Sequence, residues 1–367
     1  MRRMTSRLAV MGAAFALLVG CANPELRVAA EDTVAPIAPG SAPVSMTFFG
    51  TSSFLVEAGE TQLLIDGYFS RAAHYLIGKI GPKPDRILGE LYRHRICKPK
   101  AARHQGGQHP DCARPDAARL DLILALHGHY DHAMDAPFIA GWAGTRLLTD
   151  VSLDPIWDAT KAKWPDDGVS FNWQHARRQP YAPHLAPGFA PLPVGPMTVR
   201  LYETEHNHNF ISDQIKHVTP EDFAFNSRIW DMGLGTSVSA LIEHRAGNIL
   251  IIGSAGEIGD VLRTQNVKAQ TVFLSIGGLS RSDKADWDLY WTRAVTDTQA
   301  KRVFLIHWDN HQAKLPAPGG QLKPTVVEAH DKVLTHLRGL AKAGDVDLLF
   351  APVGQAFDPF QRTAPKG

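Results

Sequence analysis

The chain has 367 residues, of which 44% are hydrophobic and 20% are charged, so it can bury a sizeable core as one large domain or two ordinary ones. Its formal net charge is only +1. This balance argues against a general nucleic-acid-binding protein, because such proteins carry a basic excess that neutralises phosphates.

The N-terminal segment has the pattern of a secretory signal. Arg2, Arg3 and Arg7 precede a short apolar run, residues 8–20, that is too short for a comfortable membrane span. The run ends in Leu-Val-Gly-Cys, which resembles a bacterial lipobox. That resemblance makes residues 1–21 a lipoprotein-type signal segment and implies cleavage just before Cys21, lipidation of Cys21 and a periplasm-facing outer-membrane lipoprotein. An ordinary signal peptide with an incidental cysteine is the alternative.

Residues 22–43 are rich in Ala and Pro and predict an extended tether between the membrane and a folded domain at residues 44–367. The domain opens with three short strands, in MTFFG, SFLVEAG and TQLLIDG, which are separated by Gly-containing turns. Asp66 closes the third strand. We therefore expect a β-rich opening that ends on a carboxylate.

A polar, basic insertion follows at about residues 67–119. From Arg71 to Arg119, eleven Lys or Arg residues face four acids. A loop this long inside a compact domain is usually functional or disordered. It can serve as a lid that attracts an anionic substrate, or as a patch that faces anionic lipid. A solvated loop with no further role is the alternative.

Two cysteines, Cys97 and Cys112, lie within this insertion. An exported compartment permits a disulfide between them, which would close one loop. Zinc binding by this pair is the weaker alternative, because no Cys-x-x-Cys spacing or second pair accompanies it.

Metal-capable side chains gather directly after the insertion. Residues 120–126 form an apolar run that predicts a buried strand, and it ends at His127, His129, Asp131 and His132. His127 and His129 are two residues apart, so in an extended segment their side chains point the same way. Asp131 and His132 can enter the next helical turn and face an adjacent position, so the pattern can serve two neighbouring ions. Imidazoles and a carboxylate favour zinc, with manganese and iron as alternatives, and the lack of thiolates leaves room for a water ligand.

Strands and helices then alternate to the C-terminus, which predicts packed sheets with helices outside. Histidines end two of the later strands, namely His206 and His208 after the first and His307 after the second. A polar loop over residues 211–230 is expected near the site. We expect helices over residues 134–140, 155–164, 257–266, 287–300 and 325–343, and strands in TRLLT, MTVRLYETEHNHN, GTSVSALIEH, NILIIGSAG, TVFLSIGG, KRVFLIHWDNH and VDLLFAPVG.

The H-x-H-x-D-H pattern, downstream of an early Asp in LLIDG, resembles the metallo-β-lactamase superfamily of hydrolases over about residues 44–354. This resemblance implies a four-layer αββα sandwich. It implies further metal ligands at His206, with His208 as a rival, and at His307, and it makes Asp66 a support for the histidine loop. Segments such as GHYDHAMDAP and VFLIHWDNH are more similar to the lactonase-like and phospholipase-D-like branch than to the antibiotic-degrading enzymes.

One residue departs from the family pattern. Many members bridge two metals with an Asp where this chain has Ser254, in GSAG, and a hydroxyl is a poor replacement for an anionic bridge. Either the second ion is weak or absent, or another acid such as Asp309 or Glu257 substitutes. The sequence favours a primary site at His127, His129 and His206 with a weaker or absent second ion.

The expected activity is hydrolysis of an ester-like bond. A bound ion lowers the pKa of its water from 15.7 to about 7, and Asp131 would orient the hydroxide or act as a base. The substrate is a small molecule or a lipid, and the basic insertion favours an anionic one, such as a phosphodiester, over a lactone or an amide. A non-catalytic metal-binding lipoprotein is the alternative class. The sequence leaves the oligomeric state open.

Overall fold

The computed structural model describes residues 32–71, 79–99, 110–114, 116–167, 170–185, 191–207, 218–225 and 227–361, together with Leu26 and Val28. Cys21 and His208 lie outside these residues, so the predictions on lipidation and on the rival ligand are not described. Within the described residues, no helix is long and apolar enough to cross a membrane.

Within the described residues, fourteen strands form two seven-stranded sheets with the same pattern of pairing directions. Starting from β14 (Ala356–Phe357) in the first sheet and from β7 (Leu192–Val194) in the second, the first four strands pair antiparallel and the remaining strands pair parallel. The first sheet has the order β14 (Ala356–Phe357), β1 (Ser45–Phe48), β2 (Phe54–Ala58), β3 (Thr61–Ile65), β4 (Arg119–Leu124), β5 (Arg146–Thr149) and β6 (Arg177–Pro180). The second has the order β13 (Asp347–Leu349), β12 (Arg302–Ile306), β11 (Thr271–Ser275), β10 (Gly247–Ile252), β9 (Val238–His244), β8 (Met197–Glu203) and β7 (Leu192–Val194).

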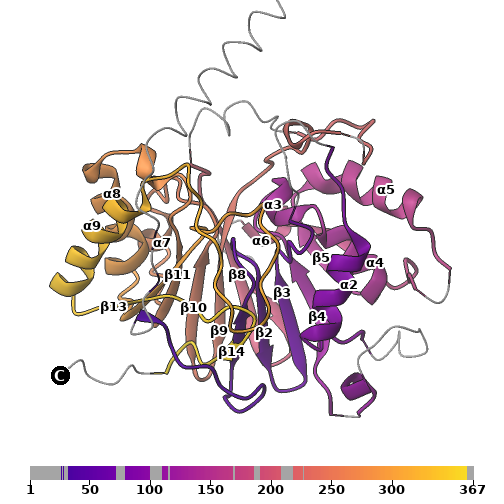
Figure 1. The fold of residues 1–367 in the computed structure, drawn as a ribbon, viewed down its shortest axis with the longest axis horizontal. Helices are drawn as coiled ribbons and strands as arrows, with labels where there is room; N and C mark the ends of the chain where they lie inside the picture. Colours follow the sequence, from indigo (N-terminus) through magenta and orange to yellow (C-terminus); the bar gives the residue numbers. More distant parts are fainter. Residues whose placement is uncertain are drawn as a thin grey trace, which may run out of the picture.

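Helices cover the outer face of each sheet, as Figure 1 shows. The first sheet is flanked by α2 (Pro84–Arg93), α4 (Ala136–Ala143) and α5 (Asp154–Lys163), and the second by α7 (Val261–Thr264), α8 (Lys284–Trp291) and α9 (His330–Ala343). The short helices α3 (Tyr130–Ala133) and α6 (Ala182–Leu185) complete the α-helical set. The four-layer αββα sandwich implied by the resemblance is confirmed.

Apolar burial holds the layers together in two clusters. One fills the space between the sheets, where the rings of Phe54 and Phe273 meet with centroids 4.7 Å apart. The other joins the first sheet to its helices and includes Leu91 of α2 and Phe138 of α4. Burying each such side chain stabilises the fold by about 1.5–3 kcal/mol, so the sheets form a rigid base for the loops at their ends.

The predicted elements are present, and most differences lie at their ends. The helix expected at residues 325–343 begins only at His330, and the one expected at 287–300 continues beyond α8 as a π-helical turn, Thr292–Thr296. The helix expected at 257–266 shortens to α7. Element ends shift because local hydrogen bonding at a terminus is weakly encoded by apolar periodicity.

The described part of the insertion corrects the expectation of a polar loop. It contains α2, which begins with Pro84 and buries Ile87 and Leu91 against the first sheet. The side chains of Arg71 and Lys98 are fully buried, and the Lys98 ammonium lies 4.8 Å from the centroid of the Trp142 ring. Ile87 and Leu91 are four residues apart, a spacing that indicates one face of a helix, but the many charged residues around them favoured the interpretation of a loop. This segment is a packed layer rather than a solvated loop.

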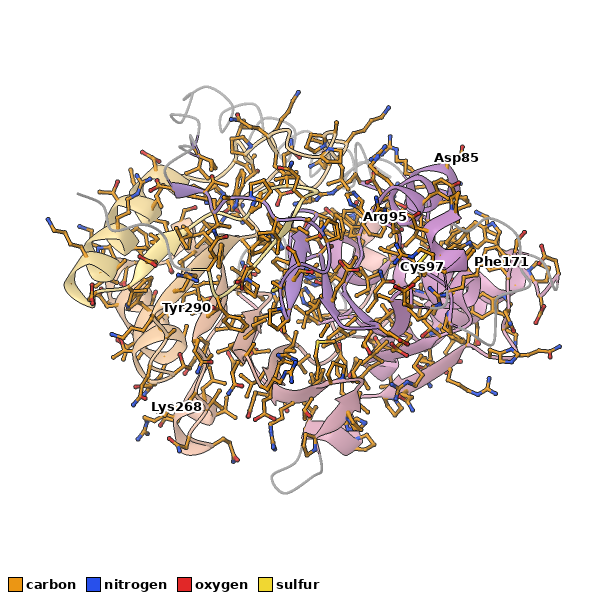
Figure 2. All side chains as sticks on the ribbon, turned by 90° about the horizontal axis from the view of Figure 1, so that it is seen from below. Asp85, Arg95, Cys97, Phe171, Lys268 and Tyr290 are labelled. Carbon is orange, nitrogen blue, oxygen red and sulfur yellow. A yellow bond between two sulfur atoms is a disulfide. The ribbon has the colours of Figure 1, made fainter. Side chains whose placement is uncertain are left out.

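The disulfide between Cys97 and Cys112 is confirmed. The Cys97 sulfur also lies 3.1 Å from the carbonyl oxygen of Arg95. Figure 2 shows Arg95 and Cys97 in the half of the molecule opposite Tyr290. Arg119 donates to the carbonyl oxygen of Cys112 at 2.7 Å. The disulfide and this hydrogen bond together tie the segment after α2 to the start of β4.

Candidate metal centre

The metal-capable side chains of three distant segments meet at the end of the sheets. His127 and His129 follow β4, Asp131 and His132 lie on α3, and α3 sits at the upper end of the two sheets in Figure 1. The loop after β8 brings His206 to them, and the end of β12 brings the last ligand candidate, His307. These side chains form two adjacent sets of three.

The first set, called the first group below, is His127, His129 and His206. One ligand atom from each lies within 4.8 Å of the others. Both ring nitrogens of His127 and Nε2 of His129 are buried and have no hydrogen-bond partner among the described residues. A buried polar atom without a partner costs about 1–3 kcal/mol, so these nitrogens fit a metal ion, which would supply the missing interaction.

The protonation of the first group also suits metal binding. Burial lowers the pKa of His127 well below its ordinary value and that of His129 to about 4. Burial, followed by the neighbouring His129, holds the pKa of His206 well below its ordinary range. All three imidazoles are therefore neutral at pH 7, the form in which histidine binds a metal.

The second set, called the second group below, is Asp131, His132 and His307. The Nε2 atoms of His132 and His307 are 3.2 Å apart, and Oδ2 of Asp131 lies 3.9 Å from the first and 3.5 Å from the second. Nitrogen and oxygen ligands about 2.0–2.1 Å from a tetrahedral zinc ion lie about 3.3 Å from one another. The second group thus has nearly the spacing that one ion requires.

Charge within the second group favours an ionised carboxylate. Burial opposes ionisation of Asp131, yet His132 and His307 together hold the pKa of its carboxyl well below its usual range. Burial also opposes protonation of His307, but its hydrogen bond to Asp131 and the charges of Asp131, Asp309 and Glu328 together raise the pKa of His307. An ion bound here would displace that proton and take the place of the positive charge beside the carboxylate.

Asp66 supports the second group from behind. Its Oδ2 accepts from Nδ1 of His132 at 2.8 Å, and its Oδ1 accepts from the backbone N–H of Leu126 at 2.7 Å. The hydroxyl of Ser52 also donates to Asp66. A carboxylate on Nδ1 leaves Nε2 free to bind a metal and fixes the ring orientation, as the resemblance implied for Asp66.

A buried ion pair holds the segment that carries His307. Arg71 and Asp309 are both fully buried, with their charged atoms 2.6 Å apart. Asp309 also accepts from the backbone N–H of Thr51 at 2.6 Å, and the Thr51 carbonyl accepts from the N–H of His307 at 2.9 Å. Arg71 further donates to the carbonyl oxygen of Phe49. The insertion therefore reaches the metal centre through one inward-facing arginine.

Backbone strain marks the same network. Thr51, Asp66 and His307 have positive φ angles of 54°, 54° and 58°. Non-glycine residues rarely adopt this region, and each such residue costs about 1–3 kcal/mol unless its surroundings impose it. The hydrogen bonds of Asp66 and Asp309 supply that constraint.

None of the acids considered as a substitute bridge lies in either group. The carboxylate of Asp309 is held by Arg71, and Glu257 is exposed. The hydroxyl of Ser254 accepts a hydrogen bond from the backbone N–H of Asn207 at 3.1 Å. Asp131 is thus the one carboxylate that the described residues bring into a candidate ligand group.

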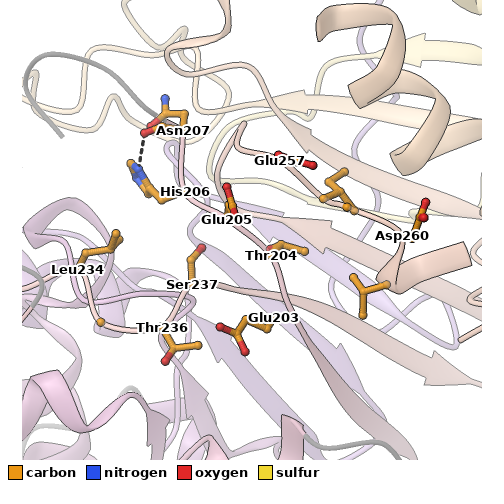
Figure 3. Close-up of a pocket in the computed structure, with 14 residues that line it drawn as sticks. Glu203, Thr204, Glu205, His206, Asn207, Leu234, Thr236, Ser237, Glu257 and Asp260 are labelled. Atoms are coloured by element: carbon orange, nitrogen blue, oxygen red, sulfur yellow. Dashed lines mark hydrogen bonds between the residues drawn. The ribbon is translucent and has the colours of Figure 1, made fainter. Parts of the chain in front are cut away.

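A pocket of about 760 Å³ adjoins the first group at His206 (Figure 3). Its lining includes the acids Glu203, Glu205, Glu257 and Asp260, and none of the insertion residues that the structure describes. Asp260 is paired with Arg263 and Arg293. The pocket is therefore polar and does not share the positive charge of the insertion.

Sequence reasoning missed the supporting residues Ser52, Thr51, Arg71 and Asn207. The serine and threonine stand in TSS, between two predicted strands, where a hydroxyl reads as an ordinary turn residue. Arg71 looked like one more charge of a basic segment. Arg71 follows the first three predicted strands, and Asp309 stands two residues after a strand-end histidine. These two positions are the signal that could have suggested the ion pair.

Comparisons with known proteins give distant matches. No protein-family model matches the chain. The UPF0173 metal-dependent hydrolase of Heliobacterium modesticaldum is 29% identical over 108 residues, which cover 29% of this chain and 30% of that protein. The match thus spans less than a third of that relative.

Two solved structures are similar at low identity. The metallo-β-lactamase fold protein YhfI of Bacillus subtilis is 12% identical with a TM-score of 0.44, covering 86% of this chain and 100% of that one. The metallo-hydrolase Igni18 of Ignicoccus hospitalis is 14% identical with a TM-score of 0.44, covering 86% and 98%.

Proposed function

We propose that this protein is a metal-dependent hydrolase of the metallo-β-lactamase superfamily. The observation that carries the proposal is the pair of adjacent ligand groups, one of which has buried imidazole nitrogens without a partner. The relative from Heliobacterium modesticaldum, which matches over 108 residues, is described as a metal-dependent hydrolase. Zinc suits the donor set best, with manganese and iron as alternatives.

The residues divide the chemistry between them. A divalent ion held here would lower the pKa of a bound water to about 7 and polarise the bond to be attacked. The three neutral imidazoles of the first group would hold such an ion with room for a water ligand, as three protein ligands do in catalytic zinc sites. Asp131, an ionised member of the second group whose charge also acts on His129 and His206, would hold the attacking water by a hydrogen bond or accept its proton.

The bond cleaved is an ester-like bond, and the pocket beside His206 bears on its type. The basic insertion favours a phosphodiester, but Arg71 and Lys98 are buried, and none of the described insertion residues lines that pocket. Glu203, Glu205 and Glu257 would repel an anionic group there. The described residues therefore favour a lactone or another uncharged ester over a phosphodiester at this pocket.

The membrane anchor is part of the same proposal. The lipobox-like ending at Cys21 supports export, lipidation and attachment to the periplasmic face of the outer membrane. The extended tether expected over residues 22–43 is wrong for residues 32–43, because Val34 is buried in the core, the N–H of Ile37 donates to the carbonyl oxygen of Ala356, and the N–H of Phe350 donates to that of Asp32. The proposed tether is therefore limited to the residues between Cys21 and Asp32. Replacing Cys21 by serine is expected to release the protein into the soluble periplasmic fraction. Retention of Cys21→Ser in the membrane would exclude the lipid anchor.

Hydrolysis assays test the activity. The purified protein, loaded in turn with zinc, manganese and iron, is assayed against panels of lactones, uncharged esters, phosphodiesters and amides. We expect turnover of at least one ester-like substrate that falls to background in His127→Ala and in His129→Ala. His336→Ala is the matched control, because His336 pairs with Asp288 outside both groups. Turnover that survives in the first two variants would contradict the proposal.

A non-catalytic metal-binding lipoprotein is the second candidate. Ser254 in place of the bridging acid favours it, because neither ligand group gains a bridging carboxylate. Tightly held metal with no exchangeable water, together with no turnover on any panel, would support this candidate over the hydrolase.

A further inference from the structure

The loop after β10, residues 253–256, lies directly against the segment that carries His206. The hydroxyl of Ser254 accepts from the backbone N–H of Asn207 at 3.1 Å. Gly256 has no room for a side chain, because an added Cβ would lie 2.0 Å from the carbonyl oxygen of Glu205 and 2.5 Å from the carbonyl carbon of His206. The GSAG sequence therefore shapes a surface that the chain around His206 occupies.

Asn207 connects this loop to the metal ligand. Its carbonyl oxygen accepts from Nδ1 of His206 at 2.8 Å, the contact drawn as a dashed line in Figure 3. Its side-chain amide donates to the carbonyl oxygen of Gly277 at 2.7 Å. A Cβ on Gly278 would lie 1.9 Å from the same amide nitrogen. Asn207 is thus held by the loops that follow β10 and β11.

This arrangement decides which nitrogen of His206 can bind a metal. A carbonyl oxygen only accepts, so the hydrogen lies on Nδ1 and the lone pair of the neutral ring lies on Nε2. Partners that fix the tautomer and the ring direction of a ligand raise metal affinity, and their loss typically costs about 10–100-fold. Ser254 is 8% exposed, so its hydroxyl bond to Asn207 is shielded from most competing water.

We infer that Ser254 is a positioning residue for the first group: its hydroxyl holds Asn207, whose carbonyl oxygen in turn orients His206. The inference rests on the metal centre of the proposed function. Ser254 then supports a metal ligand, whereas the Asp found at this position in many family members bridges two ions. The side chain acts on the ligand from behind and contacts no ion.

Metal titration tests the inference. The metal-free protein is titrated with Co²⁺, and the affinity of each bound ion and the visible absorption spectrum are measured for the wild type, Ser254→Ala, Ser254→Thr and His206→Ala. We expect Ser254→Ala to weaken by about 10–100-fold the same ion that His206→Ala loses, and to change that ion's spectrum. Ser254→Thr keeps a hydroxyl and is expected to restore both.

Ser275→Ala is the matched control. Ser275 is a fully buried serine at the end of the neighbouring strand β11, and its hydroxyl has no hydrogen-bond partner among the described residues. We expect both ions to bind this variant as in the wild type. A second variant, Asn207→Ala, removes the tie to Gly277 and is expected to weaken the same ion as Ser254→Ala. It keeps the inference testable if Ser254→Ala does not fold.

The outcomes separate the inference from the proposed function. A wild type that binds two ions, with Ser254→Ala and Asn207→Ala binding both unchanged, would overturn the inference alone. Equal weakening of both ions in Ser254→Ala would also overturn it, because that result indicates general loss of structure. A wild type that binds no ion would overturn the proposed function and the inference together.

Discussion

The two ligand groups of the centre differ in how they are supported. In the second group, His132 is held by Asp66, and the backbone of His307 is held by Thr51 and, behind it, by Asp309 and Arg71. The first group consists of three neutral imidazoles, and within the part of the chain that the structure describes neither ring nitrogen of His127 has a hydrogen-bond partner.

Charge and access differ in the same way. The second group includes an ionised carboxylate, Asp131, whereas His206 of the first group opens onto the polar pocket. A rigid, negatively charged set of ligands retains an ion, and a set of neutral ligands beside a pocket leaves a position for water and substrate. The proposed function therefore predicts that retention and reactivity are divided between the two groups.

Removing one histidine from each group gives the largest expected effect. His206→Ala is expected to lower hydrolysis to background, because the water position that faces the pocket is lost. His307→Ala is expected to lose one ion and to retain measurable turnover. Steady-state kinetics with metal analysis of each variant checks this order. Greater turnover in His206→Ala than in His307→Ala would reverse the assignment of the two groups.

Breaking the buried ion pair tests the support of the second group. Arg71→Met or Asp309→Asn leaves one buried partner without its counterpart and is expected to lower the free energy of unfolding by about 3–5 kcal/mol. The double variant is expected to lose less than the sum of the two, because no charge is left unpaired. Denaturant unfolding of the four proteins measures the coupling, and additive losses would show that the pair acts independently.

The disulfide separates stability from metal binding. Cys97 and Cys112 are 15 residues apart, so their replacement by alanine is expected to lower the stability by about 3 kcal/mol. Neither cysteine contacts a ligand group, and both metal affinities are expected to stay unchanged. Thermal unfolding and metal titration of this variant measure the two effects. A selective loss of one ion would show that the insertion acts on the centre through the bond.

The smallest effect is expected at Asp66. Asp66→Asn keeps the shape of the side chain but removes the charge beside Nδ1 of His132. It is expected to weaken the ion of the second group by about 10–100-fold, or about 1.4–2.7 kcal/mol. Competition with a chelator measures this affinity for each ion. Weakening of the ion bound to the first group would contradict the separation of the two groups.

The sequence predicted the strands, the two-sheet fold and the candidate ligands, because apolar periodicity and strand-end histidines are local patterns. It did not predict the support behind them. Arg71 and Asp309 are far apart in the chain, and a charged side chain reads as exposed unless its partner is known. The left-handed backbone at Thr51 and His307 leaves no sequence signal, since both residues usually avoid it.

The role of Ser254 could not be predicted from the sequence either. The family pattern identified what this position lacks, namely an acid between two ions. What the residue contacts depends on how the loop after β10 packs against Asn207, and that packing joins segments that are distant in the sequence. A motif can reveal a missing group, while the role of its replacement is visible only in three dimensions.

Metal content per chain tests the central claim most directly. The wild type, His206→Ala and His307→Ala are purified without oxygen, loaded with zinc, freed of excess ion and analysed by mass spectrometry of the metal. Two adjacent groups predict about two ions per chain in the wild type and about one in each variant, by the ligand sets above. One ion in the wild type that is lost in both variants would contradict the account, because it would make the six side chains a single site.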